Sequence, residues 1–149
     1  AGEPWFCEYG PELSRGFRAL KVWATIKEHG LERLGAMIAK NCRQAAQLAA
    51  RVTATPELEL LAPAELNIVC FRVRPPDLAA AAIDQLNGDI VVALQERGVA
   101  APSTTRIDGS LAIRVNITNH RTEASDIDLL IDSIIDLAGE LNERHRHQD

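Results

Sequence analysis

The sequence has few of the features that mark exported, metal-binding or membrane proteins. Its 149 residues include three cysteines, at positions 7, 42 and 70. Three is an odd number and the spacing fits no metal motif, so we expect reduced thiols in a cytoplasmic protein and no metal site. No apolar run approaches the ~20 residues of a membrane helix, and no basic-then-apolar leader opens the chain. Neither membrane insertion nor export is therefore expected.

Positive charge is also scarce. Sixteen Lys and Arg residues stand against 21 Asp and Glu residues, which gives a formal net charge of −5. Non-specific binding to a phosphate backbone depends on clustered positive charge, so a nucleic-acid partner is not expected. Hydrophobic residues make up 46% of the chain and charged residues 25%. This is the composition of a folded globular domain and not of a disordered one.

The spacing of apolar residues predicts four helices and four strands. Three- and four-residue steps predict helices over 14–29, 31–52, 78–97 and 125–141, the first two separated at Gly30. Alternation and turn residues predict strands over 58–61, 66–74, 101–107 and 111–118, the last two joined by the turn Asp108-Gly109. This order favours an α+β fold in which helices cover one face of a mainly antiparallel sheet.

Local signals refine these boundaries. Asp77 is placed to cap the helix 78–97, and Ser125 with Asp128 three residues later resembles a capping box. Asn87-Gly88 weakens the prediction for 78–97, because glycine costs ~1 kcal/mol inside a helix. Cys70 stands in an apolar run, where a small buried hydrophobe is expected. We divide the chain into an extended lead-in (1–13), connecting helices (14–52), an α/β small domain (53–141) and a frayed polar tail (142–149).

Two segments carry candidate binding residues. Arg114 alternates with the apolar residues of strand 111–118, so its planar guanidinium lies on the opposite face, where it can hold a carboxylate. A merely solvated strand residue is the alternative reading. Ser14, flanked by two arginines, can cap a helix whose N-terminus binds an anion, and plain capping is again the alternative. Of the four histidines, His120 lies in the loop after the last strand, and none has a catalytic partner or a metal motif.

Several motifs resemble those of one enzyme family. They are Leu-Ser-Arg-Gly-Phe-Arg-Ala-Leu-Lys-Val-Trp at 13–23, Asn-Ile-Val-Cys-Phe-Arg at 67–72, Ala-Ile-Arg-Val-Asn-Ile-Thr-Asn-His-Arg-Thr at 112–122 and Asp-Ile-Asp at 126–128. In order and spacing they are similar to the pyridoxal-phosphate-dependent group II amino-acid decarboxylases, which include the aromatic-amino-acid, histidine, diaminobutyrate and glutamate decarboxylases. The resemblance covers nearly the whole chain. It implies the C-terminal third of a fold-type-I enzyme, that is, the small domain preceded by a long connecting helix.

The resemblance also implies roles for individual residues. The full-length enzyme would be a homodimer that uses pyridoxal phosphate to release the α-carboxylate of an amino acid as CO2, leaving an amine. Arg114 matches an arginine that resembles a substrate-carboxylate anchor in the glutamate decarboxylases. Ser14 falls where the family places a residue near the cofactor phosphate of the neighbouring subunit. The Schiff-base lysine of the family follows a histidine, and none of Lys21, Lys27 and Lys40 does. The 149-residue chain alone is therefore expected to be inactive.

Two other functions remain open at this point. The chain can be a non-catalytic α+β domain that binds a carboxylate ligand or a partner chain, or a fragment of a pyridoxal-phosphate-dependent aminotransferase. The sequence does not identify the amino acid that is decarboxylated. It also assigns no role to His120 or Arg121, and it does not distinguish a fragment of a longer protein from a truncated gene product.

Overall fold

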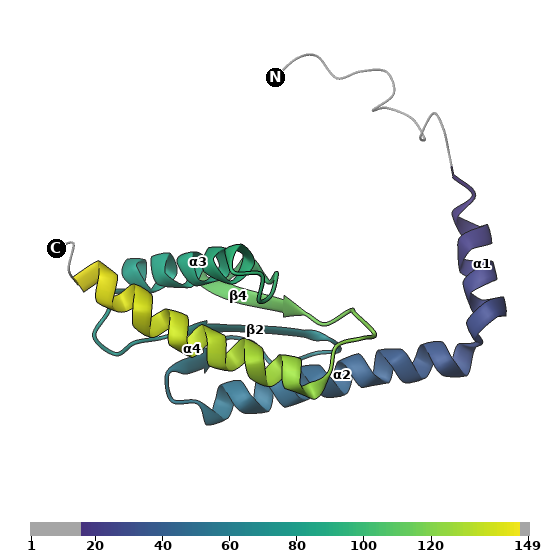
Figure 1. The fold of residues 1–149 in the computed structure, drawn as a ribbon, viewed down its shortest axis with the longest axis horizontal. Coiled ribbons are helices and arrows are strands. Elements are labelled where there is room, and N and C mark those ends of the chain that lie inside the picture. Colours follow the sequence, from purple (N-terminus) through teal and green to yellow (C-terminus); the bar gives the residue numbers. More distant parts are fainter. Residues whose placement is uncertain (1–15, 147–149) are drawn as a thin grey trace, which may run out of the picture. The chain divides into compact units, whose positions relative to one another are not determined.

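The computed structural model describes residues 16–146, with side chains described up to Glu143, and divides the chain into two compact units, Ala1–Ala36 and Met37–Asp149. The helices and strands are α1 (Arg18–His29), α2 (Leu31–Ala54), β1 (Leu58–Leu60), β2 (Ile68–Val73), α3 (Ala80–Glu96), β3 (Ser103–Ile107), β4 (Ser110–Asn116) and α4 (Ala124–Arg146) (Figure 1). None of the helices within 16–146 carries an apolar stretch long enough to span a bilayer.

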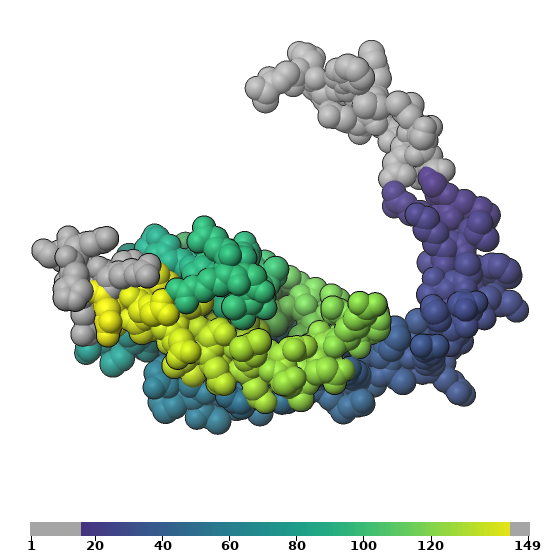
Figure 2. Space-filling model, in the orientation of Figure 1, coloured from purple at the N-terminus to yellow at the C-terminus, as the bar shows by residue number. Residues whose placement is uncertain are grey.

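The four strands of the second unit form one antiparallel sheet in the order β1-β2-β4-β3. Helices α3 and α4 lie side by side over one face of this sheet, and Figure 2 shows the surface that they form in teal, green and yellow. The C-terminal half of α2 adds its own buried residues to the same core. The predicted α+β class, with helices on one face of an antiparallel sheet, is confirmed.

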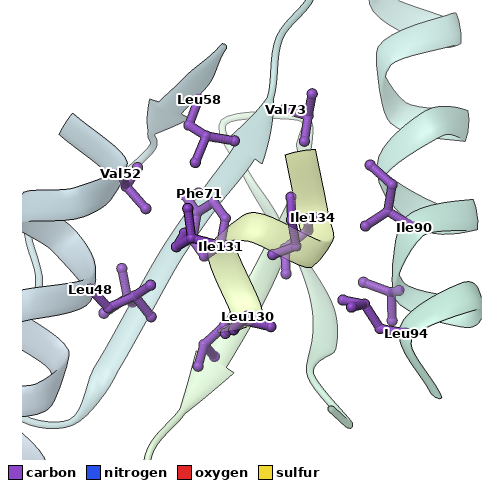
Figure 3. Packing of buried hydrophobic residues seen from close by; sticks show 14 of the residues in the cluster. Leu48, Val52, Leu58, Phe71, Val73, Ile90, Leu94, Leu130, Ile131 and Ile134 are labelled. Carbon is purple, nitrogen blue, oxygen red and sulfur yellow. The ribbon is translucent and has the colours of Figure 1, made fainter. Parts of the chain in front are cut away.

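Strand alternation builds the core on the helix-covered face. Figure 3 shows Phe71 of β2 pointing toward Ile131 of α4, with α2 on one side and α3 on the other. Most of the cluster is fully buried: Ala45, Leu48 and Val52 of α2, Val69 and Phe71 of β2, Leu86, Ile90 and Leu94 of α3, Ile113 of β4, and Ile131 and Ile134 of α4 each have 0% exposure. Burying a large aliphatic or aromatic side chain contributes about 1.5–3 kcal/mol, so this cluster is the main source of stability.

Glycines end two helices and form the hairpin turn where the sequence places them. Gly30 (φ +74°) follows α1, and Gly98 (φ +66°) lies two residues past the end of α3. Asp108 and Gly109 both have positive φ, 47° and 81°, and they join β3 to β4. Two consecutive residues with positive φ are what a tight two-residue hairpin turn requires.

Three predicted helix boundaries are wrong. Helix α1 begins at Arg18 and not at 14, with Phe17 as its N-cap, because Gly16 is a poor helix former. Asp77 does not cap α3, whose N-cap is Ala79 and has no side-chain cap hydrogen bond. Helix α4 begins at Ala124, before Ser125, and the Glu123 N–H donates to Asp126 Oδ2 at 2.9 Å in a capping contact two residues earlier than the predicted one.

The tail predicted to fray over 142–149 is in fact helical as far as Arg146. Glutamate and arginine are good helix formers, so a polar composition does not by itself end a helix. The last three residues lie outside the described part of the chain, as does the lead-in 1–13. The proposed division into lead-in, connecting helices and small domain remains a proposal.

Where β2 and β4 separate, side chains of α3 form the hydrogen bonds to the strand backbone that a neighbouring strand would otherwise form. The pairing of these strands ends at Phe71 and Ile113. Beyond it, the buried Asn87 side chain accepts a hydrogen bond from the Val73 N–H and donates one to the Val73 carbonyl, both at 2.8 Å. Asp84 accepts from the Leu111 N–H at 2.9 Å. Asn87, which weakened the sequence prediction of this helix, therefore fastens it to the sheet.

The Asp84 carboxylate also forms an ion pair at this contact between α3 and the sheet. Its second carboxylate oxygen accepts a hydrogen bond from Arg106 Nη1 at 2.8 Å. The Leu111 N–H, and then Arg106, lower the pKa of the Asp84 carboxyl below its ordinary value, since both donors favour the charged form. The carboxylate therefore stays ionised at neutral pH and continues to accept from the backbone of β4.

The turn that leads into β2 is strained. Leu66, an exposed residue, adopts a left-handed conformation with φ 54°. This conformation costs a residue with a Cβ roughly 1–2 kcal/mol. The turn is closed by a hydrogen bond from the Ile68 N–H to the Glu65 carbonyl at 3.3 Å, and it delivers Asn67 to the end of β4.

We expect Asn87→Leu to lower the free energy of unfolding by about 2–4 kcal/mol, since a buried group left without a partner costs about 1–3 kcal/mol. The substitution keeps the approximate volume and removes the bonds to Val73. Urea denaturation measures the effect, with Gln85→Leu as the matched control, because Gln85 is an exposed amide on the same helix. Equal losses for the two variants would contradict this role of Asn87.

Candidate functional site

Arg114 lies on the face of the sheet that α3, α4 and the C-terminal half of α2 leave uncovered. We call this the open face and define it by the side chains opposite the core: Glu59 of β1, Ile68, Cys70 and Arg72 of β2, Ser103 and Thr105 of β3, and Ala112, Arg114 and Asn116 of β4. Ile113 and Val115 are buried in the core on the other face. The alternation read from the sequence therefore places Arg114 correctly, at the centre of this face.

The two arginines of the open face differ in their partners. Arg72 Nε donates to Glu59 Oε2 at 2.6 Å, and Arg74 Nη1 donates to Glu59 Oε1 at 3.0 Å, so one carboxylate serves both guanidinium groups. Within the described part of the chain, the Arg114 side chain makes no ion pair and no hydrogen bond. Arg114 is half-buried in the middle of the sheet, paired with Cys70 on β2 and Ser103 on β3. Its planar donors are thus available to a carboxylate from outside.

Cys70 is the thiol next to Arg114, and the structure corrects the expectation that it is a core residue. It is half-buried on the open face, because Val69 and Phe71 on either side of it point into the core. Burial raises the pKa of the Cys70 thiol, and the Arg114 charge partly offsets this rise. The thiol is therefore mostly protonated at neutral pH and is a poor nucleophile. The pKa of this thiol therefore depends on the charge of Arg114.

Side chains of α2 hold the loop after β4 through hydrogen bonds. Lys40 Nζ donates to the His120 carbonyl at 3.3 Å and to Glu123 Oε1 at 3.2 Å, and Gln44 Nε2 donates to the Thr122 carbonyl at 2.6 Å. The side chains of His120 and Arg121 are exposed. Among the described residues, neither of these side chains forms a hydrogen bond or an ion pair with Arg114.

The lysines do not form a complete pyridoxal-phosphate site. Lys40 is engaged by the loop after β4, while Lys21 and Lys27 are exposed on α1, where Lys27 Nζ lies 6.0 Å from the centre of the Trp23 ring. A Schiff base needs a lysine amine in a site that also holds the cofactor ring and phosphate. The described residues do not fit that group by themselves. Ser14, the predicted phosphate neighbour, lies outside the described residues.

A separate hollow of about 990 Å³ lies between the start of β1, the end of β2, the start of α3 and the C-terminal half of α4. Proline and aliphatic side chains form much of its lining, and Arg114 is not among them. Sequence reasoning missed both this hollow and the contact of Asn67 with Asn116 at the edge of the open face, 2.9 Å from Nδ2 to Oδ1. The two asparagines are 49 positions apart, so only the strand register brings them together.

Comparisons with known proteins agree with this fold. The family model described as the pyridoxal-dependent decarboxylase conserved domain matches residues 6–74. The chain is 36% identical over 142 residues to an aromatic-L-amino-acid decarboxylase of Bacillus atrophaeus. The aligned region covers 95% of this chain and 30% of that protein. The chain thus spans about 30% of the length of that relative.

Solved structures share the fold. The glutamate decarboxylase domain of diaminobutyrate-pyruvate transaminase and L-2,4-diaminobutyrate decarboxylase from Vibrio parahaemolyticus matches with a TM-score of 0.75 and 31% identity, over 85% of this chain and 27% of that one. The structure of Oryza sativa TDC with PLP and tryptamine matches with a TM-score of 0.78 and 21% identity, over 87% and 29%. The fold is that of one α+β domain of such enzymes. Over nearly all of its own length the chain is therefore similar to one part of the pyridoxal-dependent decarboxylases.

We expect alkylation of Cys70 by iodoacetamide to follow a pH profile with a midpoint above that of an ordinary cysteine, about 8.5. Arg114→Gln should move the midpoint further up, because the guanidinium charge favours the thiolate. The measurement uses the chain with Cys7→Ser and Cys42→Ser. Arg72→Gln is the control, since Arg72 is paired with Glu59. A midpoint that Arg114→Gln leaves unchanged or lowers would contradict the proximity of the two groups.

Proposed function

We propose that this chain is the C-terminal part of a longer pyridoxal-phosphate-dependent amino-acid decarboxylase, which releases the α-carboxylate of an amino acid as CO2 and leaves an amine. The similarity to pyridoxal-dependent decarboxylases supports the reaction class, and the short span of the chain relative to these relatives supports a longer protein. In this proposal the remainder of the protein supplies the lysine and the other groups that hold the cofactor. The 149-residue chain alone is inactive.

The chain's own contribution is Arg114 as the anchor of a substrate carboxylate. The single observation that carries this assignment is the Arg114 guanidinium at the centre of the open face, which has no hydrogen bond or ion pair within the described part of the chain, beside Arg72, which is already paired with Glu59. A guanidinium remains charged at all working pH values and can donate two parallel hydrogen bonds to one carboxylate. Because Arg114 stands on a central strand of the sheet, its backbone is fixed, and an anchored substrate would be held in one orientation.

Arg114→Lys in the longer protein tests the assignment. Lysine keeps the charge but loses the planar pair of donors, so we expect kcat/KM for decarboxylation to fall by roughly ten- to a hundredfold, the equivalent of about 1.5–3 kcal/mol. CO2 release and circular dichroism measure activity and folding. Arg72→Lys on the same face is the control and should change kcat/KM little. Unchanged kinetics in a folded Arg114→Lys enzyme would leave Arg114 as a solvated strand residue, as in a non-catalytic domain.

We also propose that the longer protein is a cytoplasmic homodimer. Helix α1 has no buried residue, and Phe17, Leu20 and Trp23 are 71%, 49% and 58% exposed. Exposed apolar side chains grouped in this way commonly mark an interface. The free thiols of Cys42 and Cys70 support a reducing compartment. Sedimentation velocity of the longer protein should give the mass of a dimer. A monomer at micromolar concentration would overturn the proposed homodimer.

A further inference from the structure

Asn116 is the neighbour of Arg114 along the open face. It lies two residues further on β4, so its side chain is on the same side of the sheet. Two residues of extended strand span about 7 Å. Arg114 is half-buried and Asn116 is exposed, so the two side chains form a row that runs from the middle of the face toward its edge.

Asn67 fixes the Asn116 side chain from the neighbouring strand. Asn67 Nδ2 donates to Asn116 Oδ1 and to the Ile117 carbonyl, each at 2.9 Å. The Asn67 carbonyl in turn accepts from the Ile117 N–H at 2.9 Å. Three hydrogen bonds thus tie Asn67 to Asn116, the last residue of β4, and to Ile117, which follows it, and the strained turn at Leu66 precedes Asn67 directly.

These contacts also determine which way the Asn116 amide is turned. A backbone carbonyl only accepts hydrogen bonds, so the Asn67 atom that faces the Ile117 carbonyl must be the nitrogen. The same nitrogen faces Asn116, so the Asn116 atom that it meets must be the oxygen. The Asn116 oxygen is bonded to Asn67, and its NH2 group has no hydrogen-bond partner among the described residues. Asn116 can therefore offer that group to a ligand, so that Arg114 and Asn116 form a row of two donors on the open face, one charged and one neutral.

We propose that Asn116, oriented by Asn67, is a specificity-determining donor beside Arg114, and that together they favour a ligand with two carboxylates over one with a single carboxylate. This inference rests on the proposed function of Arg114 as a carboxylate anchor. Arg114 holds one carboxylate through its paired donors. The Asn116 NH2 group donates to the other, with Asn67 acting as a positioning residue that does not touch the ligand.

The test is a titration of the 149-residue chain with glutarate and with butyrate, acids of similar length with two carboxylates and one. The side-chain resonances of Arg114 Nε–H and the Asn116 NH2 group are followed by NMR. We expect glutarate to shift both resonances and butyrate to shift only that of Arg114. Glutarate should bind about fivefold tighter, the ratio given by one net hydrogen bond.

Variants separate the positioning role from a structural one. Asn67→Ala and Asn116→Leu should each reduce the affinity for glutarate to that for butyrate while leaving the butyrate affinity unchanged. Asn116→Leu keeps the bond from Asn67 to the Ile117 carbonyl, so it serves if Asn67→Ala disturbs the turn. Thr118→Val, an exposed position further along the same chain segment, is the control and should retain the preference for glutarate.

Two results would overturn the inference, and they differ in what else they imply. If both variants keep the full preference for glutarate, Asn116 is not a ligand donor, and the proposed role of Arg114 stands. If neither acid shifts the Arg114 resonance, the carboxylate anchor itself is wrong and the inference fails with it.

Discussion

The bond between the Asn87 amide and the backbone of Val73 is the contact on which the rest of the structure depends. It satisfies a buried N–H and a buried carbonyl at the point where β2 and β4 separate, and so it fastens α3 to the sheet. With α3 fixed there, α4 packs beside it over the same face. The helices of the second unit therefore lie on one side of the sheet, and they leave the other side, which carries Arg114, uncovered.

Because the helices of the second unit cover only one side of the sheet, they leave Arg114 on the uncovered side. An arginine on a solvated strand is ordinary, but Arg114 stands at the centre of a half-buried face and has no partner among the described residues, and for this reason we propose that it binds a carboxylate. The neighbouring Arg72 has a carboxylate partner in Glu59, whereas Arg114 has none among the described residues. Burial raises the pKa of the Cys70 thiol beside Arg114, so this thiol is mostly uncharged at neutral pH and does not offset the positive charge of Arg114.

The sequence predicted the fold better than it predicted the helix ends or the site. Apolar spacing decides which face of a strand is buried, so the alternation around Arg114 was correct. Capping by Asp77 and Ser125 was wrong because several polar residues near a helix start compete for the same role, and only the backbone path selects one. The partners of Arg72 and Asn116 lie 13 and 49 positions away, so the strand register had to be known first.

A structure of the longer protein with a bound substrate carboxylate would test the central claim most directly. The account predicts two nitrogens of the Arg114 guanidinium within about 3 Å of the two oxygens of one carboxylate, the geometry of a paired charge-assisted hydrogen bond. It also predicts that the substrate lies against the open face, with α3 and α4 on the far side of the sheet. A carboxylate held elsewhere, with Arg114 in solvent, would contradict it.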